Sequence, residues 1–76
     1  MTQSIDTTAT ARVAATIRAE LARRRIPQTI VAERLGMSQP SLSRRLTGDT
    51  PFDVNELAIV AEILGIPLAT LIGDAS

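Results

Sequence analysis

Residues 28–46 have the sequence QTIVAERLGMSQPSLSRRL, and this stretch decides the fold. Its first half predicts a short helix, because the apolar Val31 and Leu35 lie one turn apart and would face inward together. Gly36 follows at the place where helices commonly end in a residue of positive φ, and Ser38 is a favourable N-cap for a second helix. The stretch therefore predicts two short helices joined by a tight turn.

The segment before this pair predicts one longer helix. Val13, Ile17 and Leu21 recur every four residues and form an apolar stripe within about residues 8–25. Pro27 ends that helix and can begin the next one, since a missing N–H is harmless only in the first turn of a helix.

The segment after the pair predicts two more helices. The turn-rich loop TGDTPF spans residues 47–52, and Asp53 with Glu56 three residues later resembles a capping box. Gly65 would stop this helix, and Pro67 would open a last short one. No segment shows the alternation of a β-strand. We therefore expect an all-α chain of five helices.

Length predicts a single domain. The chain has 76 residues, of which 45% are apolar, and this is enough for one small core. We expect a polar, mobile N-terminal tail over residues 1–8 and a C-terminal tail over residues 74–76. The domain between them would span residues 9–73, with the helix pair at about 28–46.

Composition excludes several classes of protein. There is no Cys and no His, which removes disulfides, the usual zinc sites and catalysis by thiol or imidazole. The sequence has no phosphate-cradling glycine loop and its carboxylates are scattered, so we expect no enzyme activity, no metal and no cofactor. No apolar run reaches the roughly 18 residues that span a bilayer, and residues 1–8 lack the features of a signal peptide. We therefore expect no membrane partner.

The helix predicted at residues 39–46 has a polar outward face. With Leu42 at the centre of the buried face, a rotation of about 100° per residue puts Leu46 about 40° away. The outward residues are then Gln39, Pro40, Ser41, Ser43 and Arg44. Gln suits the edge of adenine and Arg that of guanine, which indicates DNA reading; the alternative is an ordinary solvated helix. Arg45 would lie at the rim, with its charged head near a DNA backbone.

At these residues the sequence resembles the helix-turn-helix of lambda-repressor/Cro-type (XRE) regulators. The matching positions in the helix pair are Gln28, Val31-Ala32, Leu35-Gly36, Ser38-Gln39, Ser41-Leu42 and Gly48. The positions that resemble the family's fourth and fifth helices are Glu56-Leu57, Val60-Ala61, residues 64–67 and Leu71. The resemblance covers roughly residues 13–72. It implies a compact five-helix domain whose third helix reads operator DNA, often as a dimer on a palindrome.

The resemblance also implies roles for individual residues. The base-reading positions would be Gln39, Pro40 and Arg44, with Ser41 and Ser43 beside them. The phosphate contacts would come from Gln28, Thr29, Thr47 and Thr50, and also from Arg45 at the rim of the helix.

Three departures from the family pattern matter. Leu21 and Leu46 occupy positions where many relatives bury an Arg–Glu ion pair, and a hydrophobic pair of that size is often as stable. Pro40 replaces a residue that could donate hydrogen bonds, although it can still contact a thymine methyl. The loop carries Asp49 and Pro51 in place of Lys or Arg, so backbone N–H groups and Thr hydroxyls would have to hold the phosphates. Because the formal net charge is also zero, we expect weak non-specific DNA binding.

Apolar residues near the C-terminus indicate a partner surface. Ile59 and Ile63 lie one turn apart, roughly opposite the face of their helix that is expected to be buried. The N-terminal tail, the last helix or a second copy of the chain could cover them. We expect a homodimer, which would set two reading helices about 34 Å apart, one turn of DNA. The candidate interface residues are Ile59, Ile63, Ile66, Leu68 and Ile72.

These features favour a sequence-specific transcriptional regulator of the minimal Cro-like or phage-repressor-like kind. Its partner would be double-stranded operator DNA, with no evident small-molecule ligand, in the cytoplasm of a bacterium or of a phage-infected cell. Repression by operator occupancy is the expected mode. Two alternatives stay open: an antitoxin of a toxin–antitoxin pair with the same fold, and a protein–protein adaptor that does not bind DNA.

Overall fold

The computed structural model describes the backbone of residues 2–73 and the side chains of residues 9–73. All regular structure in the described part of the chain is helical, which confirms the all-α class. The helices are α1 (Thr2–Arg23), α2 (Gln28–Leu35), α3 (Gln39–Leu46), α4 (Val54–Leu64) and α5 (Leu68–Gly73).

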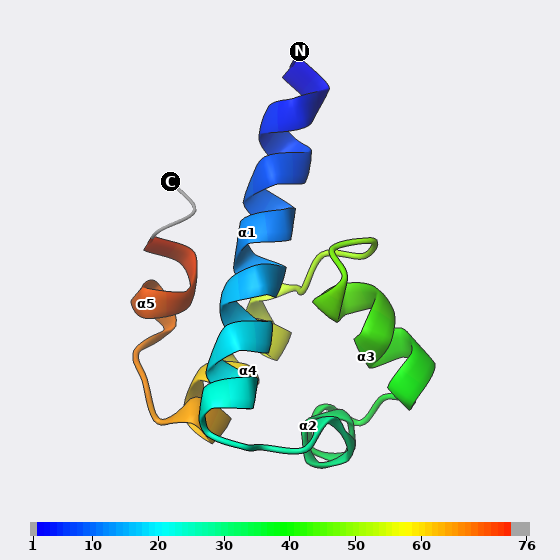
Figure 1. Ribbon diagram of the computed structural model, residues 1–76, viewed down its shortest axis with the longest axis vertical. Helices are drawn as coiled ribbons and strands as arrows, with labels where there is room; N and C mark the ends of the chain where they lie inside the picture. The colour runs from blue at the N-terminus through cyan, green and yellow to red at the C-terminus, as the bar shows by residue number, and fades with distance from the viewer. Residues whose placement is uncertain (1, 74–76) are drawn as a thin grey trace.

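The long helix α1 organises the other four (Figure 1). It contacts α3, α4 and α5 directly, while α2 packs against α3 and α4. In Figure 1, α5 lies to one side of α1, α3 lies to the other side and α4 lies behind it. As a result, one flank of the domain carries α2 and α3, with one face of α3 turned away from the other helices.

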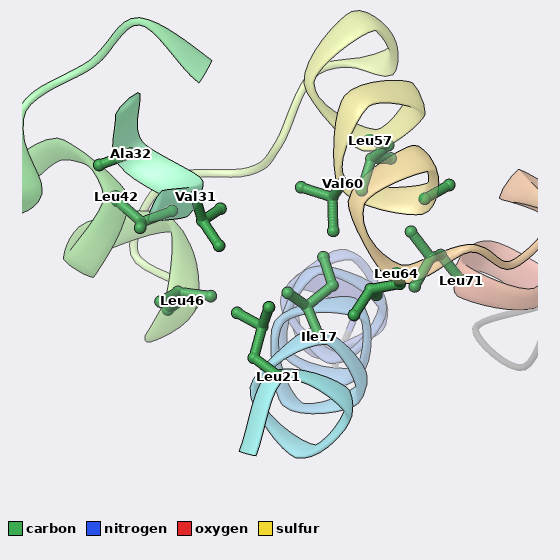
Figure 2. Packing of buried hydrophobic residues seen from close by; sticks show 11 residues of the cluster. Ile17, Leu21, Val31, Ala32, Leu42, Leu46, Leu57, Val60, Leu64 and Leu71 are labelled. Atoms are coloured by element: carbon green, nitrogen blue, oxygen red, sulfur yellow. The ribbon is translucent and has the colours of Figure 1, made fainter. Parts of the chain in front are cut away.

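The core lies where α1 crosses the other helices (Figure 2). Its most deeply buried side chains come from all five helices, and each was expected on an apolar face. They are Ile17, Val31, Leu42, Val60 and Leu71. In α2 the second buried residue is Ala32, while Leu35, which was expected to be buried with Val31, is only half-buried at the end of the helix. No buried polar residue occurs among the described side chains.

Three helices end in the same way. A residue of positive φ follows α1, α2 and α4: Arg25 at 55°, Gly36 at 67° and Gly65 at 70°. The N–H of the next residue then bonds back to a carbonyl five positions earlier, at 2.9–3.0 Å, as in a Schellman motif. These next residues are apolar and pack on the core: Ile26, Met37 and Ile66. The stops predicted at Gly36 and Gly65 are therefore confirmed.

Arg25 is the unusual member of this set, because its side chain makes a left-handed conformation strained by about 1–2 kcal/mol. Arg25→Gly is expected to raise the free energy of unfolding by about 0.5–1 kcal/mol, the gain being reduced by the greater freedom of glycine in the unfolded chain. Urea unfolding measures the difference. The control is Arg25→Ala, which removes the guanidinium and keeps the strained Cβ. If alanine stabilises as much as glycine, backbone strain is not the cause.

The start of α1 differs from the sequence expectation. The helix begins at Thr2, whereas a polar tail was expected over residues 1–8. No Pro or Gly interrupts residues 2–23, so the helix can extend toward the N-terminus at the modest cost of each added residue. Residue 1 and the expected tail at residues 74–76 lie outside the described part of the chain.

Candidate nucleic-acid interface

The start of α3 is fixed by the polar residues that the sequence indicated. Ser38 caps the helix, its Oγ accepting a hydrogen bond from the Ser41 N–H at 3.3 Å. The Ser38 hydroxyl also donates to Ser41 Oγ at 3.1 Å. Pro40 lies in the first turn, where its missing N–H leaves no bond unmade. The N-cap prediction for this helix is confirmed.

One face of α3 anchors the helix and the other faces solvent. Leu42 and Leu46 are 0% and 2% exposed and hold α3 against the rest of the core. The exposed residues of the opposite face are Gln39, Pro40, Ser43 and Arg44. Ser41 is half-buried and its hydroxyl is bonded to the N-cap, so it is less accessible than the other residues of the expected reading surface.

Arg45 is held by an internal ion pair. Its Nε donates to Glu56 Oε1 at 2.9 Å, and a second guanidinium nitrogen donates to the Ser41 carbonyl at 3.1 Å. Glu56 also accepts the Asp53 N–H at 3.0 Å and so completes the predicted capping box of α4. Only 22% of the Arg45 side chain and 16% of the Glu56 side chain are exposed. The Glu56 carboxylate therefore links α3 to the start of α4. It also pairs with Arg45, which we expected to contact a DNA phosphate.

The backbone N–H groups of the loop after α3 are occupied by hydrogen bonds within the protein. All four from residues 47–50 bond to carbonyls of the last turn of α3, at distances of 2.9–3.2 Å. The Thr47 hydroxyl donates to the Arg44 carbonyl at 3.1 Å. The expectation that these N–H groups hold phosphates is wrong for this conformation. The reason is that the last carbonyls of a helix lack partners within the helix, and the loop satisfies them.

The first turn of α2 lies at the surface. Gln28 and Thr29 are both exposed, directly after Pro27, which supplies no side-chain cap. The Pro27 carbonyl accepts the N–H groups of Ile30 and Val31 at 3.2 and 3.4 Å. The two exposed side chains therefore project from the positive end of a helix dipole, an environment that favours anions.

Arg18 is a residue near α3 that the sequence analysis missed. Its guanidinium donates a hydrogen bond to the Leu46 carbonyl, at the last turn of α3. Leu21 and Leu46 are both buried at the same junction. Arg18 and Leu46 are 28 residues apart in sequence, and no local pattern links them.

The sequence matches the family model described as Helix-turn-helix over residues 17–71, which is more than half of the chain. The chain belongs to the helix-turn-helix family. The match is to the XRE/lambda-repressor type, a family of DNA-binding regulators, and it confirms the resemblance drawn from the sequence. Searches of curated proteins and of solved structures returned no significant match.

Four arginines of this helix-turn-helix domain form ion pairs with carboxylates whose side chains the structure describes. Arg23 and Arg24 pair with Glu20 within α1, Arg34 pairs with Glu62 at 3.6 Å, and Arg45 pairs with Glu56. Among the described residues, Arg18, Arg25 and Arg44 form no ion pair with a carboxylate. Two of these three lie at α3: Arg44 on the helix itself and Arg18 at the Leu46 carbonyl.

The α4–α5 surface of the domain is less open than expected. Ile63, Ile66 and Leu68 are half-buried and pack on the core, so Ile63 does not lie opposite the buried face of α4. A residue about 110° from the centre of that face still reaches the core when a neighbouring helix flanks it. Ile59 is half-buried, and Ile72 is 42% exposed. Of the five candidate interface residues, only Ile72 is fully at the surface.

Within residues 2–73, no helix is both long enough and apolar enough to cross a membrane. Among residues 9–73, whose side chains the structure describes, no group of three or more Asp, Glu, His or Cys residues could hold a metal ion.

Proposed function

We propose that this helix-turn-helix protein binds a specific double-stranded operator through α3 and represses transcription by occupying it, in the manner of a Cro-like or phage-repressor-like switch. One observation carries the proposal. Leu42 and Leu46 anchor α3 on the core, which leaves Gln39, Pro40 and Arg44 exposed together on its outer face. A short helix of this kind fits the major groove, and it places its first side chains at the base edges.

The exposed side chains of α3 have different tasks in this proposal. Gln39 can make a bidentate contact with adenine and Arg44 with guanine, while Pro40 offers only an apolar contact for a thymine methyl. Ser43 can bond a base or a phosphate. Ser41 contributes less to reading, because its hydroxyl is already bonded to Ser38.

Phosphate contacts flank the reading helix. Gln28 and Thr29 would bind one backbone from the first turn of α2, where the helix dipole favours an anion. Thr47 and Thr50 would lie along the backbone of the other DNA strand. Arg45 would join them only by exchanging Glu56 for a phosphate, because its guanidinium is bonded to that carboxylate in the free protein.

Selection from a randomised DNA pool with the purified protein tests the proposed function. We expect enrichment of a defined half-site containing guanine and adenine at neighbouring positions. No enrichment over the starting pool would overturn the proposal.

The dependence of binding on salt concentration gives a second expected result. Because the loop N–H groups are bonded internally and Arg45 is paired, few cations remain for phosphates. The plot of log K against log salt for the selected duplex is therefore expected to have a shallow slope of magnitude below about 5, which corresponds to fewer than about six phosphate contacts. A slope implying six or more contacts would contradict this account.

Dimerisation through α4, the loop after it and α5 completes the proposal. We assign the two-fold contact to Ile72, which is exposed, and to Ile59, which is half-buried but does not pack on the core cluster. The selected sites are then expected to be palindromic, with half-sites about 34 Å apart. Analytical ultracentrifugation of the protein alone and on the selected duplex measures the stoichiometry. A protein that stays monomeric at high concentration and on its operator excludes this dimer.

A further inference from the structure

We propose that Arg18, on α1, binds a DNA phosphate beside the C-terminal end of the reading helix. This inference rests on the proposed function and adds a contact that lies outside α2, α3 and the loop between α3 and α4. Arg18 carries the inference, because its guanidinium donates to the Leu46 carbonyl while the residue as a whole is exposed.

The position of Arg18 follows from two contacts between α1 and the end of α3. The hydrogen bond to Leu46 places the guanidinium next to Thr47, where the loop begins. Further along α1, Ala11 lies beside Gly48, since a Cβ built on that glycine would be 3.5 Å from the Ala11 Cα. The flank of α1 that includes Arg18 and Ala11 therefore runs along the loop that was expected to follow the phosphate backbone.

On this flank of α1, Arg18 is a suitable side chain for binding an anion. A guanidinium has five N–H donors, and the bond to Leu46 uses one nitrogen of the group. Among the described residues, Arg18 has no carboxylate partner. The charge of Arg45 is compensated by Glu56, and the loop N–H groups are bonded to α3.

The neighbours of Arg18 on α1 allow a backbone to come close. At about 100° per residue, Ala11, Ala15 and Ala22 lie within about 60° of Arg18 around the helix axis. All three are exposed and none carries a side chain beyond Cβ. A phosphate can therefore reach the guanidinium without steric hindrance from the same face of α1.

A purely structural role is the competing explanation, because a cation at the end of a helix stabilises the helix dipole. Arg18→Gln separates the two roles, since the amide can still donate to Leu46 but carries no charge. The matched control is Arg34→Gln, which lowers the net charge equally and alters an exposed ion pair between α2 and α4. Affinities are measured for the selected duplex and for a random-sequence duplex over a range of salt concentrations, with thermal unfolding followed by circular dichroism.

For Arg18→Gln we expect the salt slope to fall by about one on both duplexes and affinity to drop by roughly five- to tenfold on each. The control is expected to keep the parent slope. A variant that loses thermal stability while keeping the parent slope would overturn the inference and leave Arg18 as a helix cap. A parent protein that binds neither duplex would overturn the proposed function as well.

If Arg18→Gln does not fold, a chemically synthesised protein with citrulline at position 18 takes its place. Arg18→citrulline retains the shape and the donors toward Leu46 and removes only the charge. The same loss of about one in slope is expected. Replacing single phosphates of the selected duplex by neutral methylphosphonates should then identify one position whose neutralisation weakens the parent and not the citrulline variant. If every position affects both proteins equally, Arg18 contacts no phosphate.

Discussion

Gln39→Ala combined with Arg44→Ala is expected to abolish sequence-specific binding while leaving the fold intact. Both side chains are exposed on α3, and neither contributes to the core, so thermal unfolding should stay close to that of the parent. Each bidentate base contact contributes about 1–3 kcal/mol of discrimination, so the pair is expected to lower specific affinity by roughly 30-fold to more than 10,000-fold. Binding to a random-sequence duplex should fall far less, since phosphate contacts supply most of it.

A matched double variant controls for the loss of two long side chains. Arg34→Ala with Glu62→Ala removes one exposed ion pair between α2 and α4, away from the outer face of α3, and should leave the binding of the selected duplex unchanged. Fluorescence anisotropy on the selected and random duplexes measures all three proteins. If Gln39→Ala with Arg44→Ala binds the selected duplex as tightly as the parent does, α3 does not read the bases. That result would favour the adaptor alternative.

Leu42→Ala is expected to have the largest effect on stability. The Leu42 side chain is 0% exposed and lies at the centre of the buried face of α3, beside the core residues of α2 (Figure 2). Truncating a fully buried leucine costs about 2–5 kcal/mol, while a domain of this size seldom has more than about 3–5 kcal/mol of net stability. Most of the variant should therefore be unfolded at 37 °C. It should also lose DNA binding, because α3 would have no anchor.

Urea and thermal unfolding followed by circular dichroism measure this change. Val54→Ala provides the comparison, because Val54 is apolar and 71% exposed, and its truncation should change the free energy of unfolding by no more than about 0.5 kcal/mol. A cooperative transition for Leu42→Ala within about 1 kcal/mol of the parent would show that the α3 anchor is not essential.

Helix boundaries were largely predictable from the sequence, because the signals that set them are local. Ser38, Gly36 and Gly65 act through their own backbone or through bonds that reach three to five residues along the chain. The capping box of Asp53 and Glu56 is equally local and was also predicted. The apolar spacing identified the inward faces of α3 and α4, since burial follows the periodicity of the helix.

The ends of α1 show where local signals were too weak. Its first residues are polar but contain no helix breaker, and the backbone is helical from Thr2. At the other end, Arg25 takes a positive φ that sequence alone would assign to glycine or asparagine. The Ile26 side chain packs on the core after this turn, and its burial can offset the strain at Arg25.

The sequence by itself determined the five helices, most of the inward face of each and most of the outward residues of α3, because these depend on periodicity and on neighbouring residues. Only the tertiary structure decided which cations are available for DNA. Arg45 is paired with Glu56, 11 residues away, and Arg18 meets the Leu46 carbonyl, 28 residues away. Such contacts depend on how the helices pack and on which backbone groups lack partners after packing, and no spacing along the chain specifies either.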